Sequence, residues 1–168
     1  MPTPAIIRPL PSANFQTALP LAKQPKTQSF KMKLFLNFAK VFWAAPNTLV
    51  GLVIGLTGLL FGGHVRRVGR AIEFYEGGIK WFLHQLPNGH FILAMTLGHV
   101  VLGQTDASLE ISREHEAVHV EQYERWGPFM LPAYLLSSVY VWLRGGRFYR
   151  DNHFEREARA RDHHGENN

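Results

Sequence analysis

The sequence predicts an α+β fold in which short antiparallel strands precede a mostly helical C-terminal half. Three observations lead to this expectation. Residues 44–63 are apolar and carry no charge, and residues 72–103 alternate short apolar runs with turn residues. From residue 106 onward, helical spacing continues between clear helix-start and helix-stop signals. The expected order is an apolar helical segment, the strands, a polar helix, an apolar connecting helix and a short C-terminal helix.

Composition limits the chemistry that the chain can carry. The 168 residues suffice for one domain with a modest core, and only 18% are charged, below the usual share of about a quarter. Cysteine is absent, which excludes disulfide scaffolds, thiolate zinc sites and cysteine nucleophiles. Any bound metal must therefore be held by histidine and carboxylate side chains.

The N-terminal part is basic. Residues 1–72 contain nine Lys and Arg and no acid, whereas the remainder carries all 13 acids. Such asymmetry is typical of a membrane-facing flank or a nucleic-acid-binding arm. Stacking aromatics are not interleaved with these basic residues in a nucleic-acid module, and an apolar run adjoins them. We therefore expect membrane lipid as a partner and no nucleic acid.

Residues 1–31 are rich in Pro, Ala, Gln, Ser and Thr, which predicts a disordered tail. Residues 32–71 then form a basic-flanked apolar segment whose charge-free core is just long enough to cross a bilayer as a helix. The spacings Gly51/Gly55 and Gly58/Gly62 permit close helix approach in lipid. The alternative is a buried core hairpin broken near Pro46.

Two to four short strands are expected over residues 72–103. The runs 79–83 and 91–95 flank Pro-Asn-Gly, a good hairpin signal, and a further run occupies residues 97–103. A helix capped by Asp106 or Ser108 should then continue through Trp126.

Gly-Pro at residues 127–128 should stop that helix. Residues 129–143 predict a buried or interfacial helix. Residues 154–162 predict a short final helix, and residues 163–168 a polar tail.

Residues 115–119 read His-Glu-Ala-Val-His, a zinc-binding motif. His115 and His119 lie one helical turn apart on the same face and can both reach one metal ion. Glu116 projects from nearly the same side, where it can act as general base toward a water that zinc has acidified.

A catalytic zinc needs a third protein ligand and an open position. A third His ten residues after His115 would mark the metzincin pattern, but that residue is Arg125. Glu155 is the best candidate, because a Glu-x-x-Ala helix after a long apolar connector fits an antiparallel return past the zinc helix. Glu157 is the fallback, and His153 is a weaker third choice.

The chain resembles the minimal gluzincin-type metallopeptidases of bacteria. The resemblance covers about residues 46–160 and rests on residues 97–103, on HEAVH followed three residues later by Gln122, and on Glu155-x-x-Ala158. The stretches HEAVHVEQYERWGPFMLPAYL and YRDNHFEREA are also similar to a family of small bacterial proteins.

The resemblance implies His115, His119 and Glu155 as zinc ligands, Glu116 as general base, and residues 97–103 as a strand that pairs with a peptide substrate. It makes residues 72–162 a minimal metallopeptidase-like domain.

The sequence departs from the gluzincin pattern at three positions. Arg113 and Glu121 occupy places that are usually uncharged, and Arg159 stands where the usual residue is Asp. The contact that orients a zinc-bound His would then come from elsewhere, with Asp151 or Asn152 as candidates.

Several other residues can have either a functional or a purely structural role. His99 can line the cleft or close a four-ligand structural site, although a packed histidine is the commoner case. Tyr123 and Tyr149 can stabilise an oxyanion or belong to the core. The aromatic residues Trp126, Tyr140 and Trp142 can form an interfacial belt or a core.

We therefore expect a zinc-dependent metallopeptidase at the membrane, in bacteria the inner membrane, that hydrolyses peptide bonds with a zinc-activated water and Glu116 as general base. The alternative is a non-catalytic membrane protein with a structural metal site or with no metal. A fourth ligand, His99 or His153, would favour the structural site.

Overall fold

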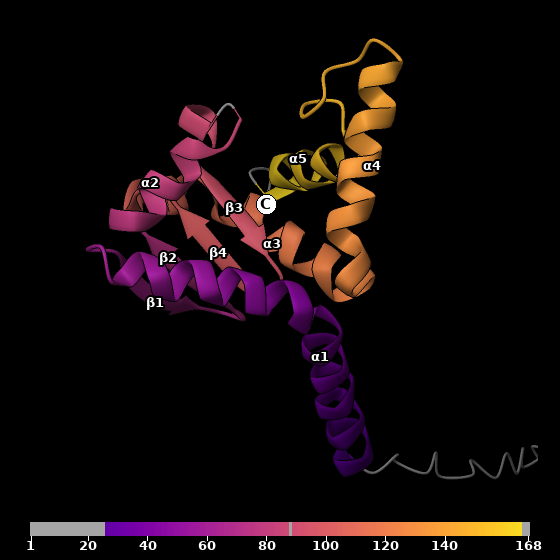
Figure 1. The fold of residues 1–168 in the computed structure, drawn as a ribbon. Helices are drawn as coiled ribbons and strands as arrows, with labels where there is room; N and C mark the ends of the chain where they lie inside the picture. Colours follow the sequence, from indigo (N-terminus) through magenta and orange to yellow (C-terminus); the bar gives the residue numbers. More distant parts are fainter. Residues whose placement is uncertain (1–25, 88, 166–168) are drawn as a thin grey trace, which may run out of the picture.

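The computed structural model describes residues 26–87 and 89–165 and confirms the α+β class (Figure 1). Its elements, in chain order, are α1 (Lys26–Leu59), β1 (His64–Val68), β2 (Ala71–Tyr75), α2 (Gly77–Gln85), the 3-10 helix η1 (Gly89–Phe91), β3 (Ala94–Leu97), β4 (Val100–Gly103), α3 (Asp106–Trp126), the 3-10 helix η2 (Gly127–Phe129), α4 (Met130–Leu143) and α5 (His153–Gly165).

Both expected tails lie partly outside the described residues. Helix α1 begins at Lys26, inside the segment expected to be a disordered tail over residues 1–31. Helix α5 continues to Gly165, inside the tail expected from residue 163.

The four strands form one sheet in the order β1-β2-β4-β3. The two outer pairings are antiparallel, as expected, but β2 and β4 pair in parallel, with Ile72 opposite Val100. A parallel pair needs a long crossover connection, and residues 76–99 supply it. Strand β1 lies within residues 32–71, so the sheet begins inside the segment expected to be purely membrane-associated.

The run at residues 79–83 is a helix, so the expected hairpin around residues 87–89 is wrong. Ile79 and Leu83 are completely buried and lie four residues apart, while Lys80 and Trp81 between them are exposed. This is the burial pattern of one turn of an amphipathic helix, and α2 forms accordingly.

Helix α1 is continuous through Pro46 and bends where it meets the sheet (Figure 1). A proline inside a helix removes a hydrogen bond and produces such bends. Residues 31–42 before the bend are all exposed, whereas residues after it contact the sheet. By length and composition alone, Lys31–Leu59 is able to cross a membrane.

Glycines set the distance between α1 and the sheet. A Cβ atom at Gly51 would lie 2.7 Å from Val100 Cβ, and one at Gly55 would lie 2.5 Å from the Phe74 ring. Both distances are too short for real atoms, so only glycine allows this approach. The Gly51/Gly55 spacing thus packs a helix against a sheet, where we had expected contacts between helices in lipid.

Strand β4 is buried on both faces. Val100 and Leu102 belong to the core beneath α1 and α2, and Val101 packs with Leu109 and Val120 of α3. Because successive side chains of a strand point to opposite faces, α1 and α3 cover opposite sides of the sheet. This arrangement fixes α3 against the strands.

Helix α3 begins and ends where local chemistry dictates. Its N-cap is Thr105, whose hydroxyl accepts a hydrogen bond from the Ser108 backbone N–H at 3.1 Å, so neither Asp106 nor Ser108 is the cap. The helix ends at Trp126, as predicted, because Gly127 adopts φ 55°.

Asn152 sets the position of α5. Its Oδ1 accepts a hydrogen bond from the Phe154 backbone N–H, and its Nδ2 donates to Tyr134 O and Ser138 Oγ of α4. The side chain is completely buried. It therefore caps the first turn of α5 and ties that turn to α4, directly before Glu155.

Candidate metal centre

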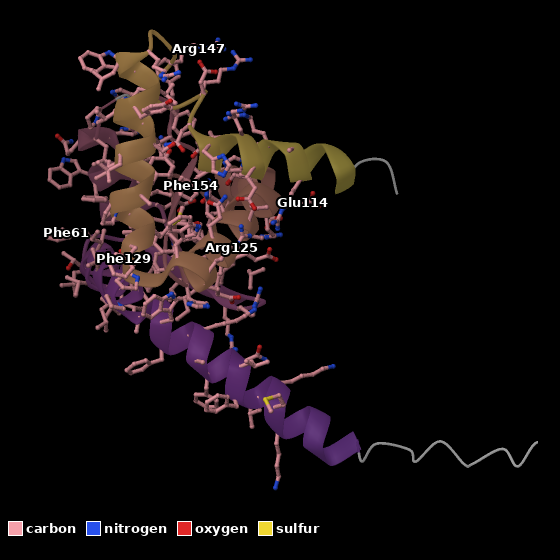
Figure 2. All side chains as sticks on the ribbon, turned by 90° about the vertical axis from the view of Figure 1, so that its right-hand side faces the viewer. Phe61, Glu114, Arg125, Phe129, Arg147 and Phe154 are labelled. Atoms are coloured by element: carbon pink, nitrogen blue, oxygen red, sulfur yellow. The ribbon has the colours of Figure 1, made fainter. Side chains whose placement is uncertain are left out.

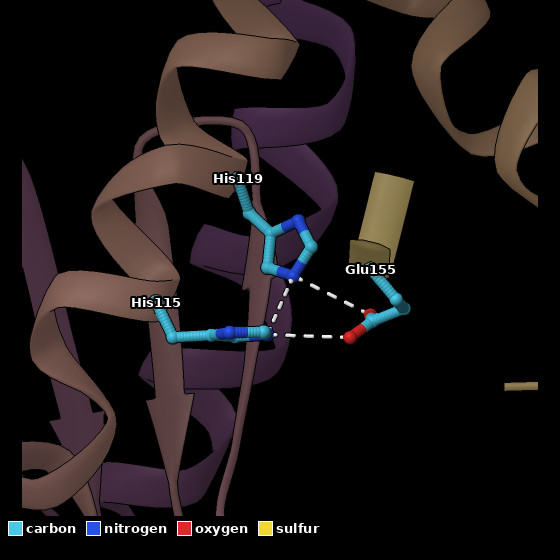
Figure 3. Close-up of side chains that lie close together, drawn as sticks. All are labelled: His115, His119 and Glu155. Atoms are coloured by element: carbon cyan, nitrogen blue, oxygen red, sulfur yellow. Dashed lines mark hydrogen bonds and ion pairs between the residues drawn. The ribbon is translucent and has the colours of Figure 1, made fainter. Parts of the chain in front are cut away.

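Helix α3 presents two imidazoles to one point. His115 and His119 lie one turn apart, and their Nε2 atoms are 3.1 Å from each other (Figure 3). Figure 3 shows both rings directed toward the start of α5. The i, i+4 spacing that suggested a shared ligand thus brings the two nitrogens together.

Glu155 completes the cluster from α5. Its Oε2 lies 3.3 Å from His115 Nε2, and its Oε1 lies 3.4 Å from His119 Nε2. Two ligand atoms that are each about 2.0–2.1 Å from a tetrahedral zinc ion are roughly 3.3 Å apart. The observed separations are close to this value, so the structure brings the predicted ligands His115, His119 and Glu155 together at a distance that fits one metal ion.

One buried oxygen in this cluster makes no hydrogen bond. Glu155 is 2% exposed, and its Oε2 lies 3.3 Å from His115 Nε2 and 3.5 Å from the Arg159 guanidinium. A buried carboxylate oxygen without a hydrogen bond is costly unless a cation lies close to it. The donor set and this oxygen fit a metal cation.

Charges within the cluster favour the ligand form of Glu155. Burial alone would raise the pKa of this carboxyl, but contacts from His115, His119 and Tyr134 hold the pKa well below its usual value. Burial alone would lower the pKa of the His119 ring. The neighbouring carboxylates of Glu155 and Glu116 outweigh this effect and raise the pKa above its usual value of 6.5.

Two neutral side chains hold the ligands in place. The Tyr134 hydroxyl of α4 donates to Glu155 Oε1 at 2.8 Å. The Oε1 of Gln122 lies 2.9 Å from His119 Nδ1, so an Nδ1–H can donate to it and leave the Nε2 lone pair for a metal. The Gln122 Nε2 also donates to Phe154 O and to Glu157 on α5. Gln122 therefore sets both the orientation of His119 and the register of α5.

Glu116 lies beside the cluster but outside the ligand set. Its Oε2 accepts a 2.6 Å hydrogen bond from the Thr96 hydroxyl of β3, and the residue is 6% exposed. Burial raises the pKa of its carboxyl, while His119, Thr96 and His115 pull the pKa in the other direction. A carboxylate with a raised pKa beside a metal cluster has the properties of a general base.

The other candidate ligands lie elsewhere. Glu157 forms ion pairs with Arg125 and Arg161, and His153 is an exposed residue that packs on Phe154. His99 is buried, and its Nε2 lies 3.3 Å from Glu124. Among residues 31–87 and 89–161, whose side chains the structure describes, the ligand cluster therefore has three members.

The departures from the gluzincin pattern have local explanations. Arg113 pairs with Glu110 and Glu121 pairs with Arg161, both at the surface. Asp151 and Asn152, the two residues expected to orient a zinc-bound histidine, have other partners. Asp151 pairs with Arg147, and the side-chain amide of Asn152 caps α5. Gln122 is instead the residue whose side chain contacts His119 Nδ1 and orients its ring.

Of the aromatic candidates, Tyr123 is buried in the core beneath α1. Tyr149 is an exposed residue, and loss of water around its hydroxyl and then the Glu155 charge raise its pKa. Trp126, Tyr140 and Trp142 are all more than 40% exposed, so they are surface aromatics and do not form a core.

Most of the segment expected to pair with a substrate, residues 97–103, has no free strand edge. Within residues 97–103, β4 is hydrogen-bonded to β2 on one side and β3 on the other. The outer edge of β3, Ala94–Leu97, is the free edge beside α3. Thr96 lies on this strand, so the edge and Glu116 are directly linked.

Thr96 and Tyr134 were not anticipated. Tyr134 lies in an apolar helix where its polar hydroxyl was the only available signal, and Thr96 carries no sequence signal.

Comparisons with protein-family models, with curated proteins and with solved structures found no match.

Proposed function

We propose that this chain is a membrane-associated, zinc-dependent hydrolase that cleaves peptide bonds. One observation carries the proposal: the buried cluster His115/His119/Glu155 has zinc-ligand spacing and lies beside a fourth ionisable group, Glu116, that takes no part in it. Structural zinc sites are closed by four protein ligands, whereas catalytic sites use three. The three-member cluster supports the catalytic type.

The metal, Glu116 and Thr96 would have different roles in hydrolysis. Zinc, when bound, would polarise a substrate carbonyl and lower the pKa of a water molecule toward neutrality. Glu116 would accept the proton of that water at a carboxylate oxygen and later pass it to the leaving amine. The Thr96 hydroxyl fixes Glu116 in place, and burial keeps its basicity high.

The edge of β3 is the proposed binding site for an extended peptide. An extended chain can add to a free strand edge through backbone hydrogen bonds. Strand β3 is such an edge and packs against α3, the helix that carries the cluster. The Thr96–Glu116 hydrogen bond joins this edge to the proposed base.

Attachment to a membrane is proposed for α1. Residues 31–42 are exposed throughout although most of them are apolar, and helix Lys31–Leu59 has the length and composition of a span. Basic residues lie on both sides of the apolar run. In a bacterial cell the inner membrane is the site that fits this arrangement.

A non-catalytic role for the same metal site is the alternative. Arg159 favours it, because its guanidinium lies 3.5 Å from Glu155 Oε2 and competes with a metal for that oxygen.

Glu116→Gln separates the two functions. We expect the variant to bind zinc as the wild type does and to lose hydrolysis of a mixed peptide library in detergent solution. Glu114→Gln, an exposed neighbour on the same helix, is the matched control and should keep both properties. Undiminished hydrolysis in Glu116→Gln would refute the assignment of the base. A wild-type protein that binds zinc but cleaves no peptide would favour the non-catalytic alternative.

A further inference from the structure

One side of the molecule presents apolar side chains from α1, α2, η2 and α4. Phe61 and Phe129 lie on this side in Figure 2, and Glu114 lies on the opposite side. Phe61, Phe129 and Trp81 are each more than 60% exposed. Exposed large apolar side chains gathered on one side of a folded protein are typical of an interaction site.

Helix α4 is the most apolar part of this side. Residues 126–143 contain no charged residue. Met130 and Ser138 pack inward, whereas Leu136, Trp142 and Leu143 are 62% to 72% exposed. A surface helix of a water-soluble protein turns a polar face outward. Helix α4 turns an apolar face outward, which suits contact with an apolar medium.

The loop after α4 is basic and aromatic. Arg144, Arg147 and Arg150 with Asp151 give residues 144–151 a net charge of +2. Exposed Phe148 lies among them, and the Arg144 guanidinium stands 4.9 Å from the centre of the Tyr140 ring. Arginine and amphipathic aromatics at the end of an apolar helix are typical of the headgroup region of a membrane.

Charge is divided between the two sides of the molecule. Helices α1, α2 and α4 contain no Asp or Glu, whereas α3 carries six of the 13 acids of the chain against two Arg, a net charge of −4. An anionic bilayer attracts the first side and repels the second. This complementarity selects anionic lipid as the occupant of the apolar side.

We propose that α4 lies in the headgroup and upper acyl region of an anionic bilayer, with Arg144 and Arg150 at the lipid phosphates. This contact is separate from the membrane attachment proposed for α1 and does not depend on the metal centre. Tyr134 of the same helix bonds Glu155, so the metal cluster would lie within about one helix diameter, roughly 10–12 Å, of the lipid. Membrane-proximal peptide segments would then be the substrates within reach.

Site-directed spin labelling tests this placement, because the chain has no cysteine to compete for the label. A nitroxide at Leu136→Cys on α4 should gain collisions with oxygen and lose collisions with a water-soluble nickel chelate when vesicles of phosphatidylcholine and phosphatidylglycerol are added. A label at Glu114→Cys on α3 should stay in water. A Leu136 label that remains in water on vesicle-bound protein would overturn the proposal.

The headgroup preference has its own control. Each arginine near an anionic surface contributes about fivefold in binding, so Arg144→Gln with Arg150→Gln should weaken the binding of α4 to lipid, read from a lipid titration of the Leu136 label, roughly 25-fold. Arg156→Gln with Arg161→Gln on α5 removes the same charge and should change the signal less than about twofold. An equal response to pure phosphatidylcholine would refute the anionic preference. A label already protected before lipid is added, in a particle of twice the chain mass, would show that a second copy covers α4.

Discussion

The hydroxyl of Tyr134 donates a 2.8 Å hydrogen bond to Oε1 of Glu155, the one proposed ligand that comes from outside α3. Tyr134→Phe removes this bond and keeps the ring contact with Phe154. Loss of a partner that orients a ligand typically costs 10- to 100-fold in metal affinity, so we expect zinc binding to weaken by about tenfold. Competition with a chromophoric chelator measures it.

Tyr140→Phe on the exposed face of the same helix is the control and should bind zinc as the wild type does. Equal zinc affinity in Tyr134→Phe and the wild type would mean that the hydrogen bond does not support the ligand.

Gln122 links the two halves of the site. It contacts His119 Nδ1 and donates to Phe154 O and Glu157, all while completely buried. Gln122→Ala removes all three of these buried hydrogen bonds, so we expect the free energy of unfolding of the metal-free protein to fall by about 2–3 kcal/mol. Urea unfolding measures it. Gln85→Ala, at an exposed glutamine, should change stability by less than about 0.5 kcal/mol, and a similarly small change in Gln122→Ala would contradict this account.

The contact between α1 and the sheet depends on Gly55. An added Cβ would lie 2.5 Å from the Phe74 ring, so Gly55→Ala forces the helix and sheet apart. We expect a loss of about 1–3 kcal/mol in unfolding free energy, the usual cost of overpacking. Leu56→Ala, at the exposed residue next to Gly55, is the control. If α1 crossed a membrane without touching the sheet, Gly55→Ala would leave the stability of the domain unchanged.

Zinc affinity should depend on pH through His119. Carboxylates raise the pKa of this ring above 6.5, and a protonated ring cannot bind metal. Apparent affinity should therefore fall about tenfold per pH unit once the pH drops below that raised pKa. Because the pKa of His119 is higher in the folded protein than in the unfolded chain, its protonation stabilises the metal-free fold below pH 6.5. This stabilisation is lost as the pH rises through the raised pKa of His119. Zinc titrations from about pH 8 to about pH 5 test it, and a constant affinity over this range would exclude His119 as a ligand.

The sequence predicted the parts of the site that local spacing determines. One helical turn separates His115 from His119, and Gly127 after Trp126 ends α3, so both features follow from neighbouring residues. Glu155 was also anticipated, because a short helix after an apolar connector can return past α3 only in a few ways.

Long-range contacts could not be predicted in the same way. The parallel pairing of β2 with β4 and the helical state of residues 79–83 depend on which elements pack together. Thr96 reaches Glu116 only because β3 lies against α3, and no spacing in the sequence encodes that contact.

Zinc stoichiometry of the purified full-length chain tests the metal centre most directly. We expect one zinc ion per chain, lost on replacing His115, His119 or Glu155 by Ala. Glu157→Ala, two residues away on the same helix, should still bind one zinc ion, because Glu157 pairs with arginines and lies outside the cluster. A wild-type chain without zinc, or a Glu155→Ala variant that binds zinc as tightly as the wild type, would contradict the proposed centre.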